Sequence, residues 1–336
     1  VQFEAVPGHG VLLHAQVNAA GDGAPIVLMG HMDTVFPAGT VAKRPYREEA
    51  GRAFGPGVAD MKSGLVLNVF VAEAFARCGG LKAPLHLFFS CDEEIGSPAT
   101  RDLIMDRVRG ARAVFNAEPG RVSGNVVTSR KGSMLVEFEV EGVAAHAGIN
   151  HAAGASAIEA LARKTLALHA LTDLATGVTA NVGVVHGGVV SNMVAPHARA
   201  ELDLRFTADT NPEDLLARVR AIIEEESVPR TQGRITVARS TLPMKPTPDY
   251  LLALYQESAR TLGFEVQGEF TGGAADSGLT ASVGVPTLCA TGPVGGHPHT
   301  EREYCELTTF VPRAQAVALA VLGHPEPHGA AVERAH

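Results

Sequence analysis

The stretch Ile26-Val27-Leu28-Met29-Gly30-His31-Met32-Asp33 is a short apolar run that ends in a glycine and two polar side chains. A continuous apolar run of this length is typical of a strand buried in a parallel sheet. Residues 85–89 and 113–115 form two more such runs, and each leads into acidic residues. Residues 61–77 have helical periodicity and stop at Cys78-Gly79-Gly80, where glycine is the expected helix terminator. The order of strand, helix and strand predicts an open α/β sheet.

Polar side chains follow each of the three predicted strands. His31 and Asp33 come after the first strand, Glu93 and Glu94 after the second, and Glu118 after the third. In an open α/β sheet, ligands bind at the carboxyl ends of the strands. We therefore expect these side chains to gather at one edge of the sheet.

Two further segments carry metal-ligating residue types. Asp60 lies in the glycine-rich segment 57–64, just before the predicted helix, and His299 lies in His297-Pro298-His299-Thr300. Zinc is bound by histidine nitrogen and carboxylate oxygen, and two such ions about 3.5–4 Å apart need a bridging carboxylate. The sequence predicts one nitrogen each from His31 and His299, a bridge from Asp60, and one carboxylate per ion from Glu94 and Glu118.

The remaining polar residues of these segments suit supporting roles. Asp33, two residues beyond His31, is expected to accept a hydrogen bond from the second ring nitrogen, which fixes the tautomer. If the segment is extended, Glu93 points away from Glu94 and is free to act as a general acid/base. Taken singly, these residues would be read as helix caps, turn residues or a solvated pair. Five sites in this order favour a two-metal hydrolase instead.

Composition limits the function classes. A chain of 336 residues is expected to form two domains, and 46% hydrophobic with 19% charged residues is ordinary globular composition. The net charge of −8 without a basic block argues against nucleic acid and a polybasic membrane anchor, and no apolar stretch approaches the ~18 residues of a membrane span. Four cysteines without a CxxC pair fit a reducing compartment, so a cytoplasmic location is expected. Because residue 1 is valine, an N-terminal piece that could have carried a signal peptide is expected to be missing.

The pattern changes near Arg130. Residues 136–140 alternate apolar and acidic side chains, as in an antiparallel strand with one buried face. Further on, the sequence predicts helices at 154–171 and 211–226 and strands near 179–185, 200–206 and 235–237. The α/β pattern then resumes with a helix at 248–262, a strand at 285–290 and a closing helix after residue 311. We therefore expect a small α+β domain, residues 131–242, inserted into a larger catalytic domain of residues 1–130 and 243–336.

The motifs resemble those of the two-zinc exopeptidase and deacylase family that contains carboxypeptidase G, aminoacylase, acetylornithine deacetylase and succinyl-diaminopimelate desuccinylase. The resemblance spans nearly the whole sequence. It rests on Gly-His-Met-Asp-Thr-Val-Phe-Pro (30–37), Ala-Asp-Met-Lys-Ser-Gly (59–64), Asp-Glu-Glu-Ile-Gly-Ser (92–97), Ala-Glu-Pro (117–119), Ala-His-Ala-Gly (145–148) and His-Thr-Glu-Arg-Glu-Tyr (299–304). It implies a zinc-exopeptidase-like catalytic domain with a mixed, largely parallel sheet. The insert is implied to be a ferredoxin-like lid and dimerisation domain, with hinges near residues 130 and 242.

The resemblance also implies roles for single residues. His31, Asp60 and Glu118 would hold one zinc ion, and Asp60, Glu94 and His299 the other, with Co²⁺ or Mn²⁺ as substitutes. Glu93 would be the general acid/base, and His146 would contact the oxyanion, often across the dimer. His297 competes with His299 for the last position. His299 fits better, because it directly precedes Thr300 and lies a few residues ahead of Glu303-Tyr304.

Substrate contacts are implied less directly. Asn192 and Arg205 match lid residues that contact the substrate carboxylate, and a guanidinium suits a bidentate grip. A plain alternative is that Arg205 is an exposed strand arginine paired with Asp203 or Glu201. Gly272 and Gly273 are weaker substrate-binding candidates, since their loop fits an ordinary turn and lacks the order of a P-loop.

The predicted function is zinc-dependent cleavage of the amide bond of a C-terminal amino acid in a small peptide or N-acyl substrate, by a homodimer. The motifs favour the carboxypeptidase G branch. Folate-hydrolysing relatives carry a Gly-Arg-Pro segment after the last lid strand, and residues 237–243 lack it, which leaves glutamate specificity open. Alternatives are an N-acyl-amino-acid deacylase, a non-catalytic metal- or peptide-binding homologue, and a cysteine hydrolase using Cys91.

Overall fold

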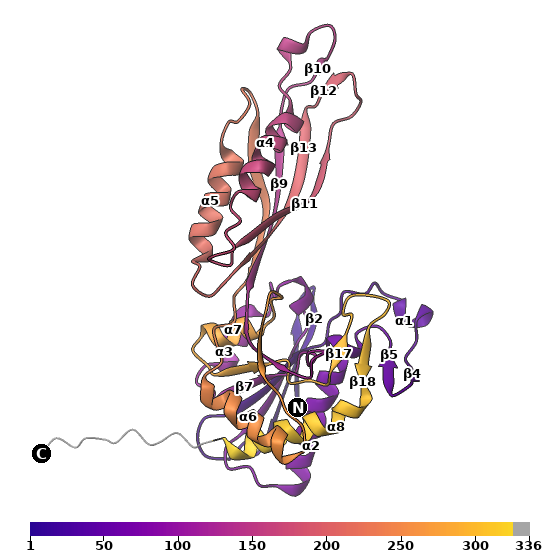
Figure 1. Ribbon diagram of the computed structural model, residues 1–336, viewed down its shortest axis with the longest axis vertical. Helices are drawn as coiled ribbons and strands as arrows, with labels where there is room; N and C mark the ends of the chain where they lie inside the picture. Colours follow the sequence, from indigo (N-terminus) through magenta and orange to yellow (C-terminus); the bar gives the residue numbers. More distant parts are fainter. Residues whose placement is uncertain (325–336) are drawn as a thin grey trace, which may run out of the picture. The chain divides into compact units, whose positions relative to one another are not determined.

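Three buried apolar strands lie side by side in the middle of an eight-stranded sheet (Figure 1). In this computed structural model, which describes residues 1–324, β3 (Ile26–His31) is flanked by β6 (Leu85–Ser90) and β7 (Ala113–Asn116). Both neighbours run parallel to β3, with His31 opposite Ser90 and Met29 opposite Asn116. The carboxyl ends of the three strands therefore meet at one edge of the sheet, as the sequence predicted.

The sheet continues on both sides in the order β1-β2-β6-β3-β7-β16-β8-β15. The outer strands are β1 (Gln2–Val6), β2 (Gly10–Val17), β16 (Thr287–Cys289), β8 (Val126–Arg130) and β15 (Gly268–Thr271). β16 runs parallel to β7, whereas β2 is antiparallel to β6 and β8 is antiparallel to β16. The predicted α/β fold with a mixed, largely parallel sheet is confirmed. The β1–β2 hairpin was not predicted.

Three helices share one hydrophobic core with this sheet: α2 (Ser63–Cys78), α6 (Asp249–Thr261) and α8 (Phe310–Gly323). The core includes strand side chains such as Leu28 and Phe115 and the fully buried Tyr255 of α6. Shorter helices are α1 (Thr40–Lys43), α3 (Arg101–Val108) and α7 (Ser277–Ser282). Burial of this apolar surface is the main contribution to the stability of the sheet and its helices.

The segment before α2 is a wide turn, so the helix begins at Ser63 and not at Met61 as predicted. Gly57 has φ of 72°, a left-handed conformation that glycine adopts without strain, and the Asp60–Met61 peptide bond is cis. Gly64 allows the first turn of α2 to approach Ala117 closely. A Cβ at Gly64 would lie 1.9 Å from the Ala117 carbonyl oxygen. The helix start is thereby packed against the segment that carries Glu118.

A small second sheet in the same part of the chain has the order β17-β18-β5-β4. Its strands are β4 (Arg47–Glu49), β5 (Arg52–Phe54), β17 (Gly295–Gly296) and β18 (Tyr304–Glu306). The segment between β17 and β18 contains His297 and His299. The sequence analysis did not predict this sheet, because its strands are only two or three residues long.

The inserted part of the chain forms an α+β fold with the order β-α-β-β-α-β, which is ferredoxin-like. Its elements are β9 (Gly132–Glu141), α4 (Ala157–His169), β11 (Thr179–Gly187), β13 (His197–Phe206), α5 (Pro212–Glu224) and β14 (Gln232–Thr241). The four strands pair antiparallel in the order β11-β13-β9-β14, and a separate two-stranded hairpin joins β10 (Ala145–His146) to β12 (Met193–Val194). Ser156 and Asn211 cap α4 and α5 through side-chain oxygens.

Contacts divide the chain into two units. Unit 1 contains Val1–Ser129, Lys245–Thr271 and the described residues from Leu279 onward, and unit 2 contains Arg130–Met244 and Gly272–Gly278. The sequence analysis placed residues 272–278 in the catalytic domain. Their contacts group them with unit 2, where Arg130 Nη1 donates to the Gly273 carbonyl at 3.1 Å. Over residues 1–324, every helix falls short of a membrane-crossing segment in length or in apolar character.

Candidate metal centre

The edge of the sheet in unit 1 collects polar side chains from three strands. His31 is the last residue of β3, Glu93 and Glu94 follow β6, and Glu118 lies two residues beyond β7. Asp60 joins them from the turn before α2. All of these residues belong to unit 1, so their geometry can be described within one compact body.

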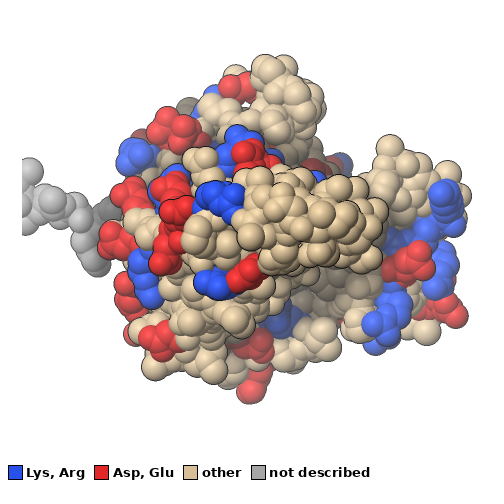
Figure 2. Space-filling view, turned by 90° about the horizontal axis from the view of Figure 1, so that it is seen from above, with Lys and Arg blue, Asp and Glu red and all other residues tan. Residues whose placement is uncertain are grey.

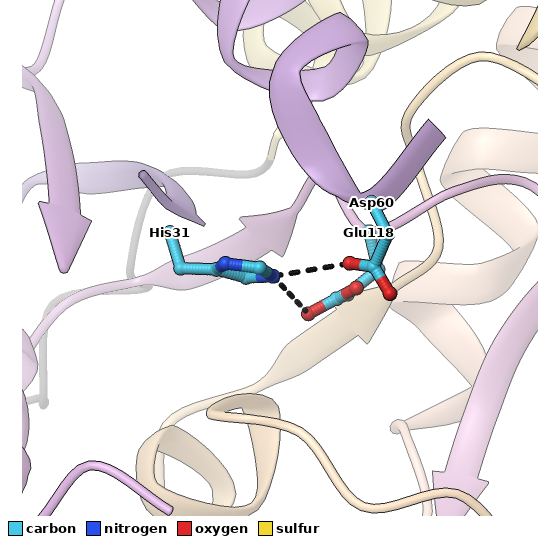
Figure 3. A group of neighbouring side chains, drawn as sticks. All are labelled: His31, Asp60 and Glu118. Carbon is cyan, nitrogen blue, oxygen red and sulfur yellow. Dashed lines mark hydrogen bonds and ion pairs between the residues drawn. The ribbon is translucent and has the colours of Figure 1, made fainter. Parts of the chain in front are cut away.

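The first group of possible ligands is His31, Asp60 and Glu118 (Figure 3). The imidazole of His31 points at both carboxylates, with Nε2 at 3.1 Å from Asp60 Oδ1 and 3.9 Å from Glu118 Oε1. His31 and Glu118 are buried, whereas Asp60 is partly exposed. The three side chains thus surround one point from three different segments of the chain.

The second group is Asp60, Glu94 and His299. His299 Nε2 lies 3.2 Å from Asp60 Oδ2 and 3.2 Å from Glu94 Oε2. Asp60 therefore faces His31 with one carboxylate oxygen and His299 with the other. A carboxylate that divides its oxygens in this way has the geometry required of a bridge between two ions.

The residues fit a pair of zinc ions in their chemistry and spacing. Ligands at about 2.0–2.2 Å around a tetrahedral zinc ion lie roughly 3.3–3.6 Å from one another, close to the separations found here. Moreover, Glu94 Oε1 is buried without a hydrogen-bond partner. A buried carboxylate oxygen with no donor has unfulfilled acceptor capacity, which a cation would satisfy.

The crowding of carboxylates shifts the pKa of both histidines upward. Burial alone would lower the pKa of His31, but hydrogen bonds to Asp33 and Asp60 and the charges of Glu93 and Glu118 raise it well above its usual value. Hydrogen bonds to Asp60 and Glu94 raise the pKa of His299 to about 10. Conversely, although burial opposes the shift, His299 and His31 lower the pKa of Asp60. In the metal-free protein, protons on the two imidazoles compensate the negative charge.

Asp33 contacts two of the segments that meet here. His31 Nδ1 lies 3.1 Å from the Asp33 backbone carbonyl and 3.4 Å from its Oδ1, so the main-chain oxygen is the nearer acceptor. Asp33 Oδ2 accepts the backbone N–H of Glu94 at 2.9 Å. Asp33 thereby connects the residue after β3 to the turn after β6.

The predicted opposite directions of Glu93 and Glu94 required an extended segment, but this segment is not extended. Residues Glu93–Ile95 form one tight helical turn, closed by hydrogen bonds from Ile95 and Ser97 N–H groups to the Asp92 carbonyl. Even so, the two carboxylates approach different histidines. Glu94 Oε2 lies near His299, and Glu93 Oε2 lies 4.0 Å from His31 Nε2.

His297 takes no part in either group of the described residues. Its ring stacks edge-on against Tyr304, with the ring centroids 5.9 Å apart. Both His297 and His299 have positive φ, which turns the segment sharply and leaves only His299 directed at Asp60 and Glu94. The geometry therefore favours His299 over His297, as the sequence comparison of the two positions did.

Cys91 does not have the environment of a nucleophile. Burial, together with the negative charges of Asp92 and Asp33, raises the pKa of the Cys91 thiol to about 11. Reactive cysteines need the thiolate and lie in electropositive surroundings. The alternative of a cysteine hydrolase loses support.

His146 and Asn192 lie together in unit 2. His146 is exposed on β10, and the Ala147 N–H donates to the Asn192 carbonyl at 2.9 Å. His146 Nδ1 accepts the backbone N–H groups of Gly148 and Ile149 at 3.1 and 3.2 Å. Because Nδ1 is occupied as an acceptor, the neutral ring carries its proton on Nε2, which is left as an outward donor.

Arg205 is not near this pair within unit 2. It lies opposite Ser133 near the end of β13, whereas β12 and Asn192 precede the start of that strand. Eight residues of strand from His197 to Arg205 span roughly 26 Å. Within one chain, Asn192 and Arg205 are therefore separated by roughly the length of β13, and the contact of both residues with a substrate carboxylate stays a prediction. Arg205 Nε contacts Asp203 Oδ1 at 3.0 Å, which is the pairing that the plain interpretation predicted.

Close packing of a side chain does not require glycine at position 272 or 273. A Cβ at Gly272 would meet nothing within 4 Å, and one at Gly273 would meet only Arg130 Nη1 at 3.7 Å. Close packing against the protein therefore does not explain a glycine at either position, and their proposed substrate role has no support from local geometry.

Two buried acidic residues next to the centre were not recognised from the sequence. Asp92 Oδ2 accepts the N–H groups of Ala99 and Thr100, and so fixes the segment after the Glu93 turn. Glu303 accepts three N–H groups of the Asp60 turn. Both residues stood inside recognised motifs, but the sequence does not show which loops their side chains contact.

Comparison with known proteins gives a consistent result. The sequence model of the peptidase family M20/M25/M40 matches residues 27–323. The chain is 28% identical over 309 residues to carboxypeptidase G2 of Pseudomonas sp. (strain RS-16), covering 89% of this chain and 74% of that protein. It is 29% identical over 332 residues to succinyl-diaminopimelate desuccinylase of Burkholderia ambifaria (strain MC40-6), covering 91% of this chain and 85% of that protein.

Among solved structures, the M20 family metallo-carboxypeptidase Sso-CP2 of Sulfolobus solfataricus has the same fold. The TM-score is 0.78 at 18% identity, covering 96% of this chain and 89% of that chain. The family suggested by the sequence motifs is thus confirmed by the sequence comparisons, and the fold by the structural comparison.

Zinc binding to the metal-free protein is predicted to tighten as pH rises from about 6 to about 8. His299 has its pKa raised to about 10, so its proton must leave before the nitrogen can bind an ion. Protonated His299 contributes to the stability of the metal-free protein. This contribution is complete below the usual histidine pKa of about 6.5 and is lost as pH rises through about 10. Each proton displaced gives up to about tenfold in affinity per pH unit.

Competition with a chelator at several pH values measures this dependence. The slope of the logarithm of zinc affinity against pH gives the number of protons displaced. This number should fall by about one in His299→Gln, whereas His297→Gln, altered in the same segment, should keep the wild-type slope. Equal slopes for the two variants would contradict the assignment of His299.

Proposed function

The chain belongs to the peptidase family M20/M25/M40, and we propose that it is a dinuclear zinc amidohydrolase that removes a C-terminal amino acid from a peptide or N-acyl conjugate. One observation carries the metal assignment: Asp60 faces His31 with one oxygen and His299 with the other. In this proposal one zinc ion is held by His31, Asp60 and Glu118, and the other by Asp60, Glu94 and His299.

Glu93 is the proposed general acid/base. When bound, the zinc ions would supply Lewis-acid polarisation of the scissile carbonyl and lower the pKa of a water molecule. Glu93 Oε2 lies 4.0 Å from His31 Nε2, and Glu93 belongs to neither ligand group, which supports a role in proton transfer and not in holding an ion. It would take a proton from the attacking water and hand it to the leaving amine.

His146 is the proposed donor to the oxyanion. Its Nδ1 is held by two backbone N–H groups, and its Nε2–H is left to donate a hydrogen bond outward. A fixed donor of this kind stabilises charge that develops on a carbonyl oxygen. Asn192, bound to the neighbouring residue Ala147, would act beside it.

Arg205 is proposed to grip the substrate carboxylate on its own chain. Its guanidinium is partly exposed and engaged by Asp203, so a substrate carboxylate would compete with that exposed pair, which is worth little. Because Arg205 and Asn192 lie at opposite ends of β13, we assign His146 and Asn192 to the catalytic site of a second copy.

A homodimer through unit 2 is part of this proposal. β11 is an edge strand of its sheet, and its residues Val184 and Val185 are exposed. Residues 143–154 and 187–196, around β10 and β12, contain no Lys, Arg, Asp or Glu but expose Ile149 and Val189. Figure 2, which views the end of the molecule where β10 and β12 lie in Figure 1, shows a largely uncharged nearest surface. An open strand edge beside an uncharged surface suits pairing with a second copy.

An N-acyl-amino-acid deacylase is the second candidate. The sequence is 29% identical to succinyl-diaminopimelate desuccinylase and 28% identical to carboxypeptidase G2, so identity does not separate the two activities. The proposed centre would cleave either amide by the same steps, and only the side of the bond that is recognised would differ.

Replacing Glu93 by Gln should lower turnover by about 10²–10⁴-fold while both zinc ions stay bound, because only the proton-transferring group is lost. Elemental analysis and steady-state kinetics on the same sample measure the two effects. Glu73→Gln, which alters a partly exposed carboxylate on α2 that pairs with Arg77, is the control and should behave as wild type. Near-normal turnover of Glu93→Gln would contradict the role.

A panel of dipeptides, N-acyl amino acids and their C-terminal amides should separate the candidate substrates. Arg205→Lys is expected to lower kcat/KM by about 10- to 100-fold for substrates with a free carboxylate and to leave the amides unchanged, since a bidentate charged contact is lost. Arg199→Lys, exposed on the same strand, is the matched control. Zinc-loaded protein with no turnover on any amide would point to a non-catalytic binding protein.

Val185→Lys should shift the protein from dimer to monomer, because it puts a charge on the edge strand of unit 2. Light scattering coupled to size-exclusion chromatography measures the mass. Val311→Lys, which adds the same charge at an exposed position on α8 of unit 1, should leave the mass unchanged. A monomeric wild-type protein would contradict the proposed dimer.

A further inference from the structure

Glu303 is a buried acidic residue whose partners are main-chain N–H groups. Its exposed fraction is 0%, and it lies just before β18, four residues after His299. Glu303 Oε2 accepts the Gly57 N–H at 2.9 Å, and Oε1 accepts the Ala59 and Asp60 N–H groups at 2.9 and 3.0 Å. Three donors on one turn thus converge on a single carboxylate.

The carboxylate and the turn depend on each other energetically. A buried carboxylate is costly unless donors satisfy it, and a bond between a charged oxygen and an N–H is about twice as strong as a neutral one. The N–H groups at the start of the turn have no helical partner, because they precede the first turn of α2. Removing the carboxylate would leave three converging donors without their acceptor.

The position of these bonds connects them to the metal centre. One of the three donors is the backbone of Asp60, the residue whose oxygens face both histidines. A second tie joins the same turn to β3, since the His31 N–H contacts Met61 Sδ at 3.2 Å. Glu303 is therefore the link between the segment that carries Asp60 and the segment that carries His299.

We propose that Glu303 is a positioning residue. It fixes the backbone of the turn so that the Asp60 carboxylate is oriented to bridge two zinc ions, and it thereby sets the metal affinity of the centre. This inference rests on the dinuclear centre of the proposed function. Glu303 itself belongs to neither group of possible ligands. It acts through the backbone of the turn.

Glu303→Gln tests the proposal with little change in volume. An amide presents one oxygen and one NH₂ group, so at least one N–H of the turn would face a donor in place of an acceptor. Loss of a residue that orients metal ligands commonly costs about 10- to 100-fold in metal affinity. We expect that loss for zinc added to the metal-free variant, measured by competition with a chelator, and an altered visible spectrum of the Co²⁺-loaded protein.

Glu306→Gln is the matched control. Glu306 belongs to β18, close to Glu303, but its carboxylate pairs with Arg52 Nη2 of β5 at 2.7 Å. Zinc affinity and the Co²⁺ spectrum should be those of wild type. Thermal unfolding of the metal-free proteins, recorded in parallel, shows whether a loss of affinity follows from a loss of fold.

Glu303→Asp keeps the test decisive if the glutamine variant does not fold. It retains the charge but shortens the side chain by one methylene, so it cannot reach all three donors, and its zinc affinity should fall between those of wild type and Glu303→Gln. Wild-type affinity and an unchanged Co²⁺ spectrum in a folded Glu303 variant would overturn the inference alone. A wild-type protein that binds no zinc would instead overturn the dinuclear centre.

Discussion

The candidate metal centre depends on four carboxylates that lie close together in a largely buried space. Asp60, Glu93, Glu94 and Glu118 surround two imidazoles at separations of 3.1 to 4.0 Å. Buried like charges repel one another and lose hydration, so they stay ionised only where positive charge compensates them. The carboxylates raise the pKa of both histidines, which favours protonated imidazoles in the metal-free protein. Zinc ions would replace those protons, and this exchange links metal binding to pH.

Compensation alone does not fix positions, and further acidic side chains hold two of the ligand segments, the Glu93–Glu94 turn and the Asp60 turn. Asp33 accepts the Glu94 N–H, Asp92 accepts the Ala99 and Thr100 N–H groups, and Glu303 accepts those of the Asp60 turn. These bonds run between side chain and main chain, and those of Asp33 and Glu303 join segments that are distant in sequence. They allow short loops, rather than regular elements, to carry ligands with fixed geometry. The parallel strands bring the ligand segments to one edge of the sheet, and the carboxylates of Asp33, Asp92 and Glu303 fix the loops there.

Much of the fold follows from sequence pattern because its central strands are continuous apolar runs and its helices have clear ends. The β1–β2 hairpin and the β4, β5, β17 and β18 strands carry no such pattern, since they are short or largely exposed. The candidate ligands His31, Glu94 and Glu118 could be predicted from residue type and position after a strand. Asp60 and His299 do not directly follow a predicted strand, and their motifs indicated them instead. The helical turn at Glu93–Glu94 could not be predicted, because its N–H groups donate to the Asp92 carbonyl and to the side chain of the distant Asp33. Alternation along β13 shows which face Arg205 occupies but not how far it lies from Asn192.

That separation on β13 constrains how the two units can share a reaction. Unit 1 contains both groups of possible metal ligands and Glu93. Unit 2 offers an N–H donor at His146 on β10 and the guanidinium of Arg205 near the far end of β13, a strand that spans roughly 26 Å from His197 to Arg205. A substrate with one scissile amide and one nearby carboxylate is too small to meet both. If both residues serve a single substrate, the donor and the guanidinium must come from different chains. Oligomer assembly would then be a condition for complete catalysis and not only a source of stability.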